Sequence, residues 1–155
     1  MKKLFLLRHG EAGFTKGKDI QRQLTENGIH RLENLGSTLK SRGFEVDFMY
    51  CSPAQRTRET AQVLKKYIPV QEEVIIESIY DGDLGDLFEL LENTSDSIQN
   101  CLIVGHNPII SLLLSRLTEE EYFTLSPGSF CVIEFPFESW KMIGVNTGIL
   151  QEIFT

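Results

Sequence analysis

The sequence lacks the long hydrophobic run and the sorting signal of a membrane or secreted protein. No stretch approaches the roughly 18 to 20 apolar residues of a membrane span, and residues 1–3 lead straight into an apolar segment without a small-residue cleavage site. Cysteines are few: Cys51, Cys101 and Cys131 all lie within apolar segments, which suits buried side chains better than a disulfide framework. We therefore expect a cytoplasmic protein with no membrane partner.

Positive charge and histidine are also scarce. A formal net charge of −7 argues against a nucleic-acid partner, because such proteins need a basic surface, but it leaves room for a few arginines around one small anion. With three histidines and no HxH or HExxH pattern, the chain offers no dedicated metal cage, so we expect metal-independent activity and no cofactor. The length of 155 residues, 41% of them hydrophobic, fits a single domain over residues 1–155.

The first apolar run ends in residues suited to chemistry. Residues 4–7 are typical of a strand buried on both faces, and Arg8, His9 and Gly10 follow at its C-terminal end. Open α/β sheets bind ligands at that end of their strands. A guanidinium offers a fork of donors to phosphate oxygens and an imidazole can attack phosphorus, so the pair predicts an anion site with a nucleophile.

Two later segments have the same organisation. A second buried-type strand, residues 101–104, runs into the GHNP segment that contains His106, and an apolar helix follows. Between the two, residues 46–51 predict a strand that runs into SPAQRTRET, where Ser52 is expected to cap a helix and its neighbouring proline to occupy the first turn. Arg56 would then lie near the start of that helix.

Three motifs in this order carry a family resemblance. RHGE at residues 8–11, SPAQRTRET at residues 52–60 and GHNP at residues 105–108 resemble those of the histidine phosphatase superfamily, also called phosphoglycerate-mutase-like. The small size and residues 19–28 are similar to the SixA-type phosphohistidine phosphatases. The resemblance covers most of the chain and weakens after GHNP, where only the pattern of strands matches.

The resemblance implies a catalytic role for several of these residues. His9 is the expected nucleophile, which would form a phosphohistidine intermediate. Arg8, Arg56 and His106 would surround the nonbridging oxygens, where electrostatic stabilisation is usually the largest catalytic contribution.

Further residues are expected to complete the phosphate site. Gly10 would let the backbone approach the phosphate. Arg22 matches an arginine just before the Leu-Thr-x-x-Gly segment of SixA-type sequences and would close the cluster from a loop. Asn107 is included in the phosphate-binding set, and Glu11 and Asn107 could orient the histidines or cap their own turns. His30 lies in a helix without motif context and is expected on the surface.

The proton donor is left open by the sequence. Larger members of the superfamily use a glutamate in a later loop to protonate the leaving oxygen, and Glu77 occupies a comparable place, with Asp81 and Asp83 as alternatives. Imidazole is a much weaker base than an alkoxide and can leave after protonation by solvent. A phosphohistidine substrate would therefore make the acid dispensable.

The remaining pattern alternates strands and helices. A helix capped by Thr25 should stop near Gly43, an amphipathic helix should cover residues 83–92, and residues 74–76 could be a strand or an extended link. Residues 129–137 and 141–147 are expected to form an antiparallel hairpin at the sheet edge. The fold class is therefore α/β: a single-domain, three-layer α/β/α sandwich with a mostly parallel central sheet and an antiparallel edge.

Spacing and loop length separate the rival functions. A cysteine-dependent phosphatase needs an arginine six positions after its thiolate, whereas Arg56 and Arg58 stand five and seven positions after Cys51. Residues 68–83 are too few for a lid domain, so an open site favours a phosphorylated protein, such as a histidine-containing phosphotransfer domain or a similar carrier. The alternatives are a phosphatase of small phosphomonoester metabolites and a non-catalytic phosphate-binding regulator.

Overall fold

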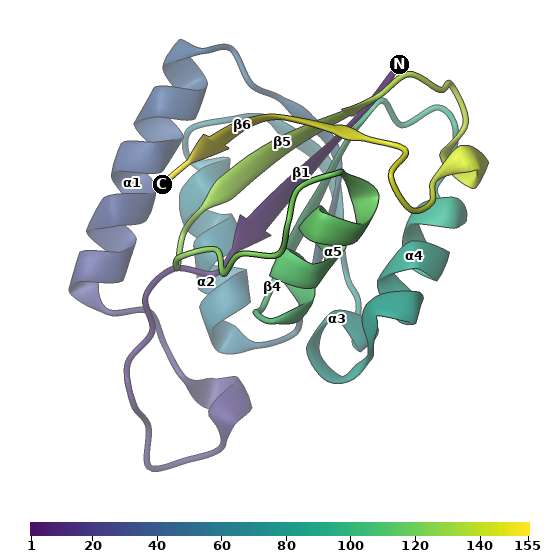
Figure 1. Ribbon diagram of the computed structural model, residues 1–155. Coiled ribbons are helices and arrows are strands. Elements are labelled where there is room, and N and C mark those ends of the chain that lie inside the picture. Colours follow the sequence, from purple (N-terminus) through teal and green to yellow (C-terminus); the bar gives the residue numbers. More distant parts are fainter.

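One six-stranded sheet organises the chain (Figure 1). The structure is a computed structural model that describes residues 1–155. In sequence order the strands are β1 Lys2–Arg8, β2 Val46–Cys51, β3 Val70–Ile75, β4 Asn100–Gly105, β5 Phe130–Phe135 and β6 Ile149–Phe154. Their order across the sheet is β3-β2-β4-β1-β5-β6, in which the first four are parallel and β5 and β6 add antiparallel. The expected parallel sheet with an antiparallel edge is confirmed.

Helices cover both faces of this sheet (Figure 1). The helices are α1 Glu26–Ser41, α2 Gln55–Lys65, α3 Ser78–Asp81, α4 Leu84–Glu92 and α5 Ile109–Leu117, with short 3-10 turns at Asp19–Gln21 and Trp140–Met142. α1 and α2 pack on one face, and α4 and α5 on the other. None of the helices combines the length and apolar character needed to cross a membrane.

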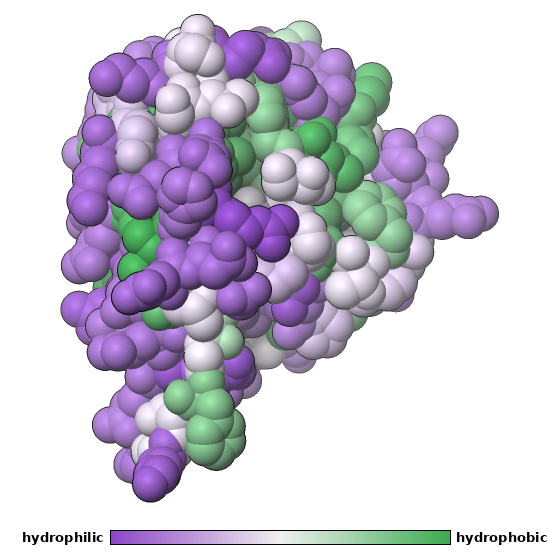
Figure 2. All heavy atoms as spheres, turned by 90° about the vertical axis from the view of Figure 1, so that its left-hand side faces the viewer, coloured by the Kyte–Doolittle hydropathy of each residue, from purple (hydrophilic) through white to green (hydrophobic).

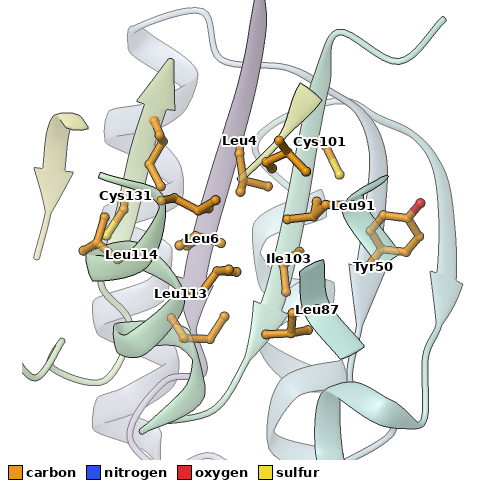
Figure 3. Close-up of a cluster of buried hydrophobic side chains, with 14 of the residues drawn as sticks. Leu4, Leu6, Tyr50, Leu87, Leu91, Cys101, Ile103, Leu113, Leu114 and Cys131 are labelled. Carbon is orange, nitrogen blue, oxygen red and sulfur yellow. The ribbon is translucent and has the colours of Figure 1, made fainter. Parts of the chain in front are cut away.

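The central strands are apolar on both faces because each face is covered. Leu4 and Leu6 of β1 join the hydrophobic cluster under α4 and α5, which Figure 3 shows, whereas Phe5 and Leu7 join the cluster under α1 and α2. Successive side chains of a strand point to opposite faces, so a continuous apolar run is what such a strand requires. This double burial fixes the position of Arg8 at the end of β1.

Two local predictions were wrong. The helix after β2 begins at Gln55 with Ala54 as its N-cap residue, so neither Ser52 nor the following proline has the expected place in the helix. In the C-terminal region, β6 is Ile149–Phe154, and not residues 141–147. A 3-10 turn, which begins at the fully buried Trp140, and a turn with Asn146 at a φ of 57° interrupt that apolar segment.

A projecting arm follows β1. Residues 12–24, called the arm below, leave the body of the molecule beside the C-terminal end of β1 and return to α1 (Figure 1). The base of the arm is closed by a bridge between Ala12 and Leu24 and by a hydrogen bond from Gly13 N to Gln23 O of 2.8 Å. Its outer part forms the foot of the space-filling view, where hydrophobic atoms lie open to solvent (Figure 2), and Phe14 is 94% exposed.

Candidate active site

Two strand ends bring the two motif histidines together. β1 and β4 are parallel neighbours with Arg8 opposite Gly105, so His9 and His106 leave the sheet side by side. Their ring centroids lie 5.3 Å apart at an interplanar angle of 56°. His9 is buried and His106 is partly buried. The pairing of these strands therefore places two imidazoles from distant parts of the sequence around one small space.

Hydrogen bonding determines which nitrogen of His9 can attack. Nδ1 lies 2.7 Å from the carbonyl oxygen of Gly10. A carbonyl can only accept, so we assign the ring proton to Nδ1. In the neutral ring, Nε2 then carries the free lone pair.

Ser52 makes the hydrogen bond that orients the ring of His106. Its hydroxyl lies 2.7 Å from His106 Nε2 and accepts a hydrogen bond of 3.2 Å from the Ala54 amide. The hydroxyl can donate its own proton to Nε2, and we assign this direction because it leaves the proton of His106 on Nδ1, the ring nitrogen that has no partner within the protein. Ser52 is thus a positioning residue for His106, and not a helix cap.

Both imidazoles are held neutral. Burial lowers the pKa of His9 to about 4, with further lowering from the guanidinium groups of Arg56, Arg8 and Arg22, while the Gly10 carbonyl opposes the shift. Burial, followed by Arg56, also lowers the pKa of His106 to about 3. At neutral pH the lone pair of His9 is therefore available without a general base.

Three buried nitrogen atoms around the histidines have no hydrogen-bond partner. They are Nε of Arg8, Nε of Arg56 and Nδ1 of His106, and they are the only such buried side-chain polar atoms in the chain. An unpaired buried donor costs about 1–3 kcal/mol, so each unpaired donor at such a site needs an explanation. We interpret these three nitrogens as donors to an oxyanion bound beside His9.

The other nitrogen atoms of these arginines hold the site together. Arg8 Nη1 donates to the carbonyl of Leu125 at 2.5 Å. Arg56, whose side chain is only 7% exposed, donates from Nη1 to the Asp19 carbonyl at 2.9 Å and from Nη2 to the Asp19 carboxylate at 3.1 Å. The terminal nitrogens thus anchor the guanidinium groups, and the Nε atoms stay free.

The arm supplies an acidic group that the motifs did not single out. The Asp19 carboxylate accepts from the Tyr80 hydroxyl at 2.8 Å and from Arg22 Nη1 at 3.4 Å, in addition to Arg56. The Tyr80 ring in turn packs edge-on against His106, with centroids 5.5 Å apart. The Tyr80 hydrogen bond, ahead of Arg56, holds the pKa of Asp19 below its ordinary value, so Asp19 is ionised at neutral pH.

Arg22 is brought to the site but is also occupied within the arm. Its Nε donates to the carbonyl of Gly13 at 2.9 Å, and its Nη2 lies 3.5 Å from the carbonyl of Ala12. The guanidinium is close enough to His9 to lower the pKa of that ring. Arg22 therefore holds the arm together, and its charge acts on His9 electrostatically.

Gly10 and Asn107, which are expected near the phosphate, each have partners within the protein. The Gly10 amide donates to Thr60 Oγ1 at 3.0 Å, and a Cβ at Gly10 would lie 2.7 Å from Cδ1 of Leu32, so the glycine is required by packing against α1. The Asn107 amide donates to the Leu125 carbonyl at 2.9 Å and accepts from Ser111. Asn107 thus holds the same carbonyl that anchors Arg8.

The three candidate acids lie on the segment between β3 and α4. Glu77 and Asp81 are exposed, and neither side chain makes a hydrogen bond. Asp83 is the N-cap of α4 and accepts from the Asp86 amide at 3.1 Å. None of the three joins the hydrogen-bond network of the histidines and arginines, whereas Asp19 does.

Comparison with known proteins identifies the family. The model of the histidine phosphatase superfamily (branch 1) matches residues 4–94, more than half of the chain. The chain belongs to the histidine phosphatase superfamily. It is similar to the phosphohistidine phosphatase SixA of Escherichia coli (27% identity over 121 residues, 76% of this chain and 75% of SixA). It also resembles a 2,3-bisphosphoglycerate-dependent phosphoglycerate mutase of Bacteroides thetaiotaomicron (38% over 98 residues, 56% of this chain and 39% of the mutase).

A solved structure supports the same assignment of the fold. The protein histidine phosphatase SixA complexed with tungstate superposes with a TM-score of 0.84 at 22% identity, covering 99% of this chain and 96% of that one. The expected phosphoglycerate-mutase-like architecture is confirmed. As a member of the histidine phosphatase superfamily with SixA among its relatives, the protein is a phosphatase.

The structure forms no comparable site for metal-dependent or cysteine-dependent chemistry. Histidine, cysteine, aspartate and glutamate nowhere gather in groups of three that could hold a metal ion. The three cysteines are free and buried, as expected, and burial raises the pKa of Cys51 to about 12 and that of Cys131 to about 12. Such thiols are not nucleophiles at neutral pH.

Sequence reasoning missed three supporting residues of this histidine phosphatase. Asp19 lies within the segment that resembles SixA-type sequences, three positions before Arg22, and this spacing was the available signal. Tyr80 lies between Glu77 and Asp81, and only the carboxylates of this segment suggested a catalytic role. Leu125 acts through its backbone carbonyl, which no side-chain pattern reveals.

Proposed function

We propose that residues 1–155 form one histidine phosphatase domain that removes phosphate from phosphohistidine on a protein, through a phosphohistidine intermediate on His9. The observation that carries this proposal is the set of three unpaired buried nitrogens, Arg8 Nε, Arg56 Nε and His106 Nδ1, beside the free lone pair of His9. Donors of this kind suit the equatorial oxygens of a phosphoryl group in transfer.

The chemistry proceeds in two transfers. In the first, His9 Nε2 bonds to phosphorus as the bond from phosphorus to the substrate nitrogen breaks, and the electron pair stays on the departing ring. In the second, water attacks phosphorus and the electron pair of the P–Nε2 bond returns to His9. Throughout, the Gly10 carbonyl keeps the proton on Nδ1, so that His9 leaves as a neutral imidazole.

The surroundings of the site favour a protein substrate. α2 ends at Lys65 and α3 starts at Ser78 with only β3 between them, so nothing in this stretch forms a lid domain. The similarity to E. coli SixA supports the same choice. Small phosphomonoesters are the second candidate, favoured by the similarity to a phosphoglycerate mutase, of which the matched region is 39%.

Rapid-quench labelling tests the proposal. The parent protein, a His9→Ala variant and a His30→Ala control are mixed with a histidine-containing phosphotransfer domain carrying radioactive phosphohistidine. We expect transient acid-labile label on the parent and on the control, and a loss of turnover of roughly 10³-fold or more in His9→Ala, as for other removed nucleophiles. Tight binding without labelling would identify a phosphate sensor, and turnover of only sugar phosphates or phosphoglycerate would identify a metabolite phosphatase.

A further inference from the structure

Asp19 lies on the solvent side of the phosphate-binding cations. Its side chain is 52% exposed, whereas that of Arg56, to which it bonds, is 7% exposed. Two carboxylate oxygens offer about four acceptor positions, and Tyr80, Arg56 and Arg22 use three of them. Asp19 therefore combines a negative charge, a fixed position and a remaining acceptor position.

The leaving group of a substrate must lie on this same side. A phosphate attached to a protein enters from solvent, and the leaving atom lies roughly in line with His9 Nε2 and on the far side of phosphorus. Asp19 also lines a cavity of about 400 Å³, together with Phe14, Thr15, Gly17 and Arg22, which is large enough for an imidazole ring. This hollow is formed by the arm and is open to solvent, and Asp19 lies both at its wall and against Arg56.

The charge on the leaving ring decides how readily the P–N bond breaks. If the second nitrogen of phosphohistidine carries no proton, the ring departs as an imidazolate anion, which is a poor leaving group. If it carries a proton, the ring departs as neutral imidazole. On the enzyme side, the Gly10 carbonyl already holds such a proton on His9, whereas no counterpart for the substrate ring has been assigned.

We propose that Asp19 is this counterpart: its carboxylate accepts a hydrogen bond from the second ring nitrogen of the substrate phosphohistidine and stabilises the protonated ring. The P–N bond then breaks, phosphorus bonds to His9 Nε2, and the electron pair neutralises the ring, which keeps its proton and leaves as imidazole. No proton donor is consumed, which accounts for the exposed Glu77 having no part in the network. This inference rests on the proposed function and adds a subsite that selects phosphoramidates.

The test compares Asp19→Asn with the parent on two small substrates. Phosphoimidazole needs the ring proton to leave well, whereas the nitrophenolate of p-nitrophenyl phosphate departs without protonation. Because a hydrogen bond to a charged group is lost, we expect kcat/KM for phosphoimidazole to fall roughly 10- to 100-fold. The alkaline limb of its pH profile should move to lower pH. The loss of the Asp19 charge beside Arg56 should also lower kcat/KM for p-nitrophenyl phosphate, but by a smaller factor, so that the ratio of kcat/KM for phosphoimidazole to that for p-nitrophenyl phosphate falls several-fold. Glu72→Gln, on the exposed edge strand β3, is the control of equal charge change.

The outcomes separate this inference from the proposed function. An equal fractional loss on both substrates would show that Asp19 acts only by holding Arg56, and no loss on either substrate would show that it does not touch the leaving ring. Either result overturns the inference and leaves the proposed function standing. A parent protein that turns over p-nitrophenyl phosphate but neither phosphoimidazole nor phosphohistidine would overturn both. Inhibition of Asp19→Asn by tungstate verifies that the oxyanion site has remained folded.

Discussion

Acidification from pH 7.5 to pH 5 should destabilise the fold through the two active-site histidines. The pKa values of His9 and His106 are about 4 and about 3 in the folded protein, against 6.5 for an ordinary histidine. The unfolded chain therefore binds more protons in this interval, and a depressed histidine pKa means that stability is present at high pH and is lost as pH falls below 6.5. Integrating the linkage gives about 2 kcal/mol for each histidine at pH 5, or about 4 kcal/mol together.

Urea unfolding at the two pH values measures this loss. With a slope of about 2 kcal/mol per molar urea, the midpoint should fall by about 2 M between pH 7.5 and 5. His9→Gln and His106→Gln should each remove about half of the change, and the exposed His30 provides the control, since His30→Gln should keep all of it. Carboxylates with a lowered pKa, such as Asp19, lose their contribution to stability mainly below pH 5. They therefore add little to the change in stability between pH 7.5 and 5.

Sulfate provides an independent check on the same reasoning, because it stays a dianion over this range. An anion between the guanidinium groups favours protonated imidazoles and should therefore weaken the pH dependence. A parent protein that is as stable at pH 5 as at pH 7.5, or a His9→Gln variant that keeps the full pH dependence, would show that these rings are not buried as neutral groups.

Two substitutions test the supports of the site. Ser52→Ala removes the hydroxyl that fixes the His106 tautomer, so kcat should fall roughly tenfold, with about 1 kcal/mol of stability lost as the Ala54 amide loses its acceptor; unchanged kinetics would mean that the tautomer is set elsewhere. Gly10→Ala should cost about 1–3 kcal/mol in urea unfolding because its Cβ would contact Leu32, and that cost should shrink in a Leu32→Ala background. Additive effects of the two changes would contradict the packing explanation.

The sequence predicted best the strands that are buried on both faces. β1, β2 and β4 are apolar runs between two helical layers, and their C-terminal ends give the positions of the reactive residues. α1 was equally clear, since Thr25 caps it through a 2.9 Å hydrogen bond from Gly28 and its apolar residues share one face. In such segments local propensity and long-range packing favour the same structure, so a pattern of residue types is sufficient.

Prediction was poorest at the C-terminal edge of the sheet. β6 is an edge strand of mixed burial, whereas the apolar residues before it include exposed Met142 and Val145. Hydrophobicity alone therefore favoured the wrong segment. The buried Trp140, whose Nε1 donates to the carbonyl of Ile98 at 2.8 Å, and the turn at Asn146 are tertiary and conformational features that periodicity does not record.

Within the site, the sequence located residues better than it assigned their partners. Motif residues have strong local signatures, but what each one does depends on partners elsewhere in the chain. Ser52 stands before a helix, as a cap would, yet a histidine 54 positions away uses its hydroxyl. Gly10 follows the nucleophile, yet its missing side chain makes room for Leu32 of α1. A motif therefore locates the reactive groups, whereas the tautomers and free donors that make them reactive follow only from which residues the fold places against them.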